Sequence, residues 1–241
     1  MKAIKHLFWA TALVLAGCGD APDTNGGALP DPEAASEPVE ADAAAAADGG
    51  DEAPTSARFQ LGTHYQRLSP TQPTSSSADR VEVAEVFWYG CPHCYTFDPY
   101  LERWEADKPA YVSFVRVPAV WNPLVQLHAR AFYTAEALGK GEEMHEAFFT
   151  EIHENDNLLD SREALAEFFG RFDVDVEAFG NAFDSFEVHT KLQRAEELSR
   201  RYRISSVPSI VVNGKYTTDG TSAGSYELLI ELIDELVASE R

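Results

Sequence analysis

The feature that most constrains the fold is a pair of cysteines two residues apart, placed directly after a run of β-branched and aromatic residues. Residues 81–89 have the composition of a buried strand. Cys91 and Cys94 follow, and Pro92 stands at an early position of the helix that we predict up to about residue 107. The chain is therefore expected to place both cysteines where a core strand leads into a helix.

The pattern around this unit predicts an α/β fold. Apolar periodicity indicates a short strand at 60–65, a further core strand at 111–117 and a long helical block at about 122–203. A hairpin at 209–218 and a final amphipathic helix at 225–237 follow. Asn213-Gly214 supplies the positive φ angles of a tight turn, and Ser161 is a good N-cap. This order resembles a thioredoxin-like domain with a large all-helical insertion.

The cysteine pair suits thiol–disulfide exchange. Free N–H groups and the helix dipole favour an anion on the first sulfur, so we expect Cys91 to be the exposed attacking thiolate and Cys94 the resolving thiol. His93 adds a positive charge or a donated hydrogen bond and favours the reduced form. No organic cofactor motif is present, so the expected redox group is the Cys91–Cys94 disulfide itself.

Two other interpretations of the pair are a metal site and an inert disulfide. A tetrahedral zinc site needs two more ligands, and the chain has only one other cysteine, Cys18. The remaining candidates lie on predicted helices, where most histidines are solvated or packed; they are His128, His145, His153 and His189. We therefore expect no metal.

Residues 87–95, with their Cys-Pro-His-Cys sequence, resemble the active-site segment of DsbA-type periplasmic thiol oxidases. Val207-Pro208 agrees with this family, in which a cis proline lies against the cysteine pair. The resemblance covers roughly residues 58–241, including the position of the insertion. It implies a substrate-binding role for Val207, Pro208 and Pro92, because a proline without an N–H leaves the preceding backbone free to pair with an extended substrate.

Glu85 interrupts the strand at 81–89, where an acidic residue is costly. The family has a buried acid at the matching place, which implies that Glu85 exchanges a proton with Cys94. The alternative is an edge-facing Glu85 paired with a nearby Lys or Arg. We expect Glu82, in the same run, to be solvated.

The resemblance implies an enzyme that donates disulfides to reduced, unfolded exported proteins and is re-oxidised by a quinone-linked membrane partner. We expect the chain to be a monomer. A periplasmic disulfide reductase or isomerase is an alternative of the same class. An alternative of another class is a non-catalytic lipoprotein that binds client proteins or copper through the same cysteines.

Residues 1–18 read as a secretory signal peptide, with two lysines before a short apolar run. Their Leu-Ala-Gly-Cys ending resembles a lipoprotein cleavage site, which implies that Cys18 becomes an acylated anchor on the periplasmic side of a bacterial membrane, inner or outer. The alternative is an ordinary secretion signal. Residues 19–57 are acidic and rich in Ala and Pro, and we expect a disordered tether.

The charge of the chain argues against nucleic acid as a partner. The formal net charge is −21, and no basic residue stands between Lys5 and Arg58. A surface this acidic repels phosphate backbones.

Overall fold

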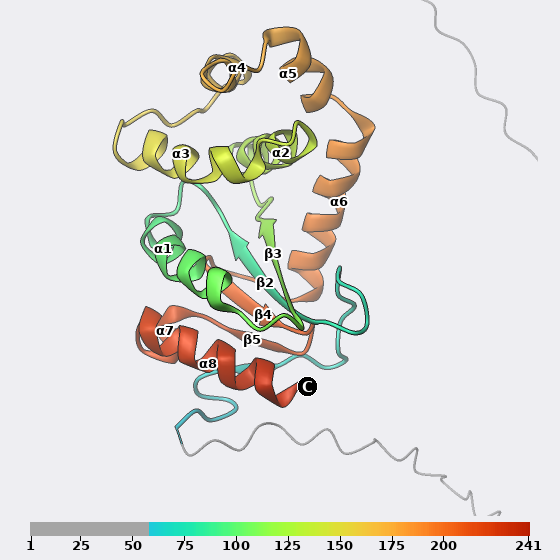
Figure 1. Ribbon diagram of the computed structural model, residues 1–241, viewed down its shortest axis with the longest axis vertical. Coiled ribbons are helices and arrows are strands. Elements are labelled where there is room, and N and C mark those ends of the chain that lie inside the picture. The colour runs from blue at the N-terminus through green and yellow to red at the C-terminus, as the bar shows by residue number, and fades with distance from the viewer. Residues whose placement is uncertain (1–57) are drawn as a thin grey trace, which may run out of the picture. The chain divides into compact units, whose positions relative to one another are not determined.

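A computed structural model describes residues 58–241, and these form the unit discussed below (Figure 1). The signal peptide, the Cys18 anchor and the tether expected for residues 1–57 lie outside the described residues. None of the helices within 58–241 has both the length and the apolar composition needed to cross a membrane.

A mixed five-stranded sheet with the order β1-β5-β4-β2-β3 forms the centre of the domain (Figure 1). Strands β2 and β3 are parallel, whereas β4 pairs antiparallel with both β2 and β5. The strands are β1 (Gln66–Arg67), β2 (Val81–Phe87), β3 (Val112–Pro118), β4 (Ser209–Val212) and β5 (Tyr216–Thr218). The expected strand at 60–65 is wrong, because that segment turns back on itself with an isolated bridge between Leu61 and Tyr65, and the paired strand begins at Gln66.

Eight helices are described, and five of them follow one another between β3 and β4 without an intervening strand. They are α1 (Pro92–Asp107), α2 (Pro123–Ala137), α3 (Gly141–His153), α4 (Arg162–Gly170), α5 (Val176–Phe183), α6 (Phe186–Arg201), α7 (Gly220–Ala223) and α8 (Tyr226–Ser239). The block α2–α6 confirms the predicted helical insertion, and Ser161 caps α4 by accepting a hydrogen bond from the Ala164 N–H. Helices α1 and α8 pack together on one side of the sheet (Figure 1).

Strand β2 is buried along its whole length because both of its faces are covered. Val81 and Val83 pack in the core that includes residues of α1 and α8. Ala84 and Val86 belong to a second core, shared with the helical insertion. The two acidic residues of the strand are therefore buried as well.

The β4–β5 hairpin turns as predicted. Asn213 and Gly214 have φ angles of 51° and 62°, the left-handed values that this turn requires. Gly214 is also confined sterically, because a Cβ there would lie 2.1 Å from the Gln72 carbonyl oxygen. Gln72 donates its own N–H to the Gly214 carbonyl at 2.8 Å, so the turn holds the loop that precedes β2.

Candidate redox site

The cysteine pair lies where β2 leads into α1. Cys91 is the N-cap of α1 and Pro92 is in its first turn. The Cys91 N–H donates to the Trp88 carbonyl at 3.0 Å, which closes a tight turn before the helix. This turn needs glycine at position 90, because a Cβ there would meet the Trp88 ring at 2.3 Å.

The two sulfurs differ sharply in acidity although they share one helical turn. Both cysteines are free thiols, so the structure describes the reduced form. A hydrogen bond from Cys94 lowers the pKa of Cys91 to about 6, with help from backbone N–H groups and the charge of His93, while burial opposes the shift. Burial and the hydrogen bond to Cys91 raise the pKa of Cys94 far above its usual value.

The expectation of an exposed Cys91 is wrong. Cys91 keeps only 8% of its surface and Cys94 none. The Val207 backbone covers the first sulfur, with the Cys91 Sγ 3.5 Å from the Val207 carbonyl oxygen. The Val207–Pro208 peptide is cis, as predicted from the resemblance. Cys91 is thus the more accessible of the two sulfurs, but only along a narrow approach.

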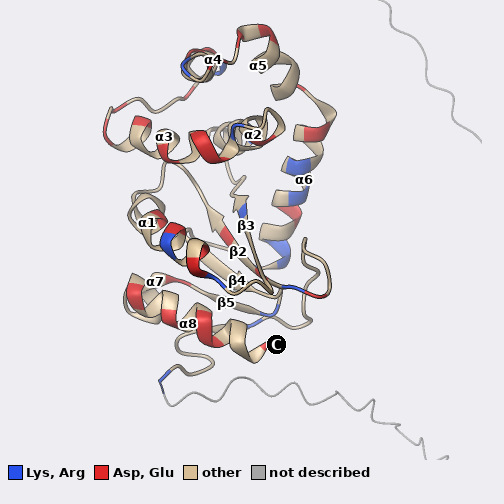
Figure 2. Ribbon diagram, in the orientation of Figure 1, with Lys and Arg blue, Asp and Glu red and all other residues tan. Residues whose placement is uncertain are grey.

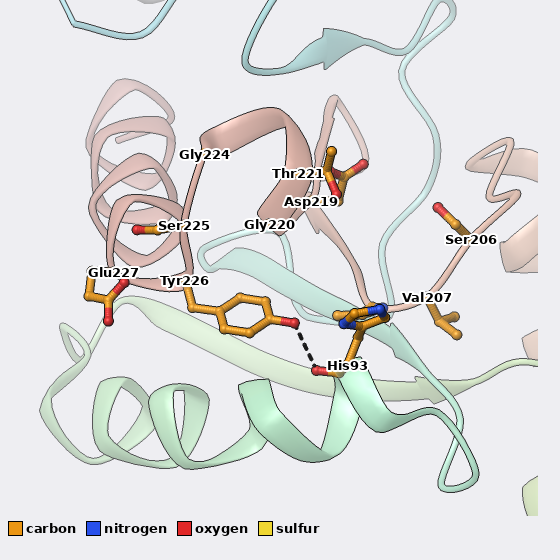
Figure 3. A pocket seen from close by; sticks show the side chains of 11 residues that line it. His93, Ser206, Val207, Asp219, Gly220, Thr221, Gly224, Ser225, Tyr226 and Glu227 are labelled. Carbon is orange, nitrogen blue, oxygen red and sulfur yellow. Dashed lines mark hydrogen bonds between the residues drawn. The ribbon is translucent and has the colours of Figure 1, made fainter.

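A cavity of about 560 Å³ opens beside the pair (Figure 3). His93, Val207 and Pro208 form the wall nearest the cysteines, and α7 with the start of α8 forms the other. The Tyr226 hydroxyl reaches across and donates to the His93 carbonyl at 3.1 Å (Figure 3). The structure thereby brings His93, Val207 and Pro208 to one site, with Pro92 and His93 exposed.

Glu85 combines the two interpretations that the sequence left open. It is 1% exposed on β2, an interior strand of the sheet, so the edge position is wrong. The parallel register places Arg116 directly beside it on β3, with 3.7 Å between the Arg116 Nε and the Glu85 Oε2. Burial raises the pKa of Glu85 to about 8, although Arg116 opposes the shift. The carboxyl is therefore mostly protonated at neutral pH.

Sequence reasoning missed a buried network behind Glu85. Arg116 also approaches the Asp98 carboxylate at 3.3 Å, and the His145 Nε2 lies 3.1 Å from the same oxygen. Burial lowers the pKa of His145, so its neutral ring donates to Asp98 through Nε2 and accepts from the Tyr89 hydroxyl at Nδ1, 2.9 Å away. The only signal in the sequence is that Asp98 stands one helical turn after Cys94.

Three of the four histidines considered as metal ligands, His128, His145 and His153, have other side-chain contacts. His128 lies between the Trp88 Nε1 and the Leu158 carbonyl, and the His153 Nε2 contacts the Tyr89 carbonyl. Within residues 58–241, no three His, Cys, Asp or Glu side chains converge as a metal site would require.

A central sheet with a cis proline facing a Cys-x-x-Cys helix start defines a thioredoxin-like dithiol protein. A family model described as "DSBA-like thioredoxin domain" matches residues 123–231. The thiol:disulfide interchange protein DsbA of Azotobacter vinelandii is 40% identical over 185 residues, which are 77% of this chain and 86% of that protein. The protein of the same name from Pseudomonas aeruginosa is 38% identical over 183 residues, 76% of this chain and 86% of the relative.

Solved structures agree with these relatives. A crystal structure of Pseudomonas aeruginosa DsbA, 38% identical, matches with a TM-score of 0.73 over 76% of this chain and 95% of that one. Oxidoreductase DsbA from Xylella fastidiosa, 33% identical, matches with a TM-score of 0.72 over 76% of this chain and 98% of that one. The chain belongs to the DsbA family of thiol:disulfide interchange proteins, and Cys91 and Cys94 are its Cys-x-x-Cys pair.

Proposed function

We propose that Cys91 passes a disulfide to reduced exported proteins and that Cys94 is the leaving group of the first step. The opposite pKa shifts of the two sulfurs carry this proposal. A substrate thiolate attacks the Cys91 sulfur, the Cys91–Cys94 bond breaks, and Cys94 leaves with the electron pair. A second substrate thiolate then attacks the substrate sulfur of the mixed disulfide and releases Cys91 as a stable thiolate. The substrate loses two electrons and the enzyme gains them.

Glu85 supplies the proton that Cys94 needs when it leaves. A thiolate on Cys94 is unfavourable in this buried position, whereas a neutral carboxyl with a pKa of about 8 holds a proton at neutral pH. After the transfer Glu85 regains a proton from solvent, because its pKa is about 8 in the reduced form, and its ionised fraction accepts the Cys94 proton when the pair is re-oxidised. His93 contributes by lowering the pKa of Cys91 through its charge and backbone N–H.

Substrate binds along the segment that covers Cys91. Val207 lies next to the sulfur, Pro208 has no N–H to compete for the substrate backbone, and exposed Pro92 borders the approach. An extended client chain would pair with the Val207 backbone, as a strand adds to a sheet edge.

The chain acts as a monomer on the periplasmic side of a bacterial membrane, anchored by acylated Cys18. Membership of the DsbA family supports periplasmic clients and a quinone-linked membrane re-oxidase as its partners. Mass spectrometry of the mature protein tests the anchor: a diacylated or triacylated Cys18 at the N-terminus supports it, and an unmodified or removed Cys18 rejects it.

The thiolate titration of the reduced protein tests the assignment of the sulfurs. Ultraviolet absorbance should show one thiolate with a midpoint near pH 6. Cys91→Ser should abolish this transition. Cys94→Ser keeps a donor to Cys91 and should leave the midpoint low, whereas Cys94→Ala removes the donor and should raise it. A low midpoint that survives in Cys91→Ser would overturn the assignment.

The reduction potential separates a disulfide donor from a reductase. We expect a value near that of the founding DsbA, about −120 mV, which is a property of that protein and does not follow from this geometry. A value near that of thioredoxin, about −270 mV, would make the protein a reductase. Client binding that survives in Cys91→Ser without any disulfide formation would indicate only a chaperone role.

A further inference from the structure

The cavity beside the redox pair has a charge that the exchange reaction does not require. Two of its lining residues, Asp219 and Glu227, are acidic, and His93 is the only lining residue that can carry a positive charge. The Glu227 backbone N–H, Ser225 and Tyr100 lower the pKa of Glu227, so its carboxylate is charged at neutral pH. Figure 3 shows Glu227 beyond the Tyr226 ring as seen from His93, and Asp219 separately at the start of α7.

The negative lining continues away from the cysteines. A second cavity of about 540 Å³ lies between α1 and α8 and shares Glu227 with the first. Asp107 and Asp234 line it, with Arg103 as its single basic residue. We call the two cavities together the α1–α8 groove. Acidic residues lie along α1 and α8, whereas α6 carries a concentration of basic residues (Figure 2).

The floor of the α1–α8 groove is aromatic. Tyr226 stacks on Phe97 at a centroid distance of 4.9 Å, and Tyr100 lies next to Tyr226 at 5.6 Å. The Arg103 guanidinium already lies 4.9 Å from the Tyr100 centroid, so this surface accommodates a cation over a ring. A ring beside carboxylates suits the stem and the charged end of a Lys or Arg side chain.

We infer that the α1–α8 groove binds a cationic segment of the client, with Lys or Arg within a few residues of the reacting cysteine. The inference rests on the proposed function, because the groove begins at the His93–Val207 wall where the client sulfur arrives. Asp219 and Glu227 attract the basic residue and repel an acidic one, so the groove selects among reduced clients by charge.

The net charge of the protein gives a competing explanation that the experiment must separate. Every cation is drawn to a chain with a formal charge of −21, wherever its acidic residues lie. Neutralising one groove carboxylate should therefore be compared with neutralising an exposed carboxylate elsewhere. Glu167 on α4 serves as this control, because it is exposed and belongs to the helical insertion.

The test uses the oxidised full-length protein and three peptides that differ only beside one cysteine, where they carry Lys, Gln or Glu. Rates of mixed-disulfide formation should fall in that order, with about a tenfold difference between the Lys and Glu peptides at low salt. Glu227→Gln, which keeps an acceptor for Tyr100, should reduce this ratio by about threefold, and adding Asp219→Asn should reduce it further. Glu167→Gln should leave the ratio unchanged.

Equal rates for the three peptides would overturn the inference and leave the proposed function standing. An equal drop of the ratio in Glu227→Gln and Glu167→Gln would also overturn it, because the selection would then come from net charge. If none of the peptides forms a mixed disulfide, the proposed function fails and the inference fails with it.

Discussion

Two glutamates three residues apart on β2 show how one residue type acquires two roles. Glu82 and Glu85 are each 1% exposed, and they point to opposite faces of the sheet. Glu82 was expected to be solvated, and that expectation is wrong. Its Oε2 accepts hydrogen bonds from the Ser75 and Ser76 N–H groups, both at 2.7 Å, and from the Ser76 hydroxyl at 2.8 Å. It ties the preceding loop to the sheet.

Glu85 has no comparable set of donors. Its Oε2 and the Arg116 Nε both lack hydrogen-bond partners among the described residues, and the 3.7 Å between them exceeds hydrogen-bond length. The difference teaches that burial alone does not decide the state of a carboxyl group. Donors hold Glu82 in place as a structural acceptor, and their absence leaves Glu85 able to keep a proton.

The largest expected contrast is in the pH dependence of stability. The pKa of Glu85 rises from 4.5 to about 8 on folding, so the unfolded chain releases this proton first and the parent loses stability as pH rises between these values. Gln does not titrate, so the reduced Glu85→Gln variant should lose up to about 5 kcal/mol less free energy of unfolding than the parent over this pH range. Denaturant unfolding between pH 5 and 8 measures it.

The comparison between parent and variant cancels the other titrating groups. Glu82→Gln is the matched control on the opposite face, because it replaces a buried carboxyl of the same strand with the same amide. Parallel pH curves for the parent and Glu85→Gln would show that Glu85 is already ionised in the fold.

A second contrast concerns the loop that Glu82 holds. Glu82→Ala should destabilise the domain by about 3 kcal/mol, because three donors lose their acceptor in a buried position. Glu82→Gln retains an acceptor oxygen and should cost less. Equilibrium unfolding of both variants measures the effect, and a loss below about 1 kcal/mol for Glu82→Ala would show that water replaces the carboxylate.

A third contrast concerns the rate of disulfide exchange, which should depend on Glu85 and not on Glu82. Glu85→Gln should slow mixed-disulfide formation at pH 7 by about tenfold, below the usual range for a general acid because a thiolate leaves readily. The deficit should shrink above pH 8, where the parent has also lost this proton. Glu82→Gln should exchange at the parent rate. A deficit for Glu85→Gln that does not vary with pH would remove proton transfer from its role.

The smallest effect tests one of the bonds to Glu82. Ser76→Ala removes the hydroxyl donor and keeps both backbone donors, so it should cost about 1 kcal/mol. Combining it with Glu82→Ala should add little, because the partner is already gone. Fully additive losses in a double-mutant cycle would show that the two side chains do not interact.

The sequence by itself determined the features that depend on neighbours along the chain. The β-branched run specified β2, Pro92 and the two cysteines marked the start of α1, and Asn213-Gly214 specified the hairpin turn. Each depends on backbone geometry or capping within a few residues, and local preferences are written in residue type. The Cys-Pro-His-Cys motif indicated thiol–disulfide chemistry for the same reason, because its four residues are neighbours along the chain.

Only the tertiary structure decided which buried groups interact. Residue type alone does not distinguish Glu82 from Glu85, because it does not show that the preceding loop folds back onto Glu82 or that another strand places a guanidinium beside Glu85. His145 meets Asp98 across 47 positions, and Tyr100 meets Glu227 across 127. Desolvation and long-range pairing set the proton on Glu85 and the charge of the α1–α8 groove, and both depend on what the fold packs around a side chain.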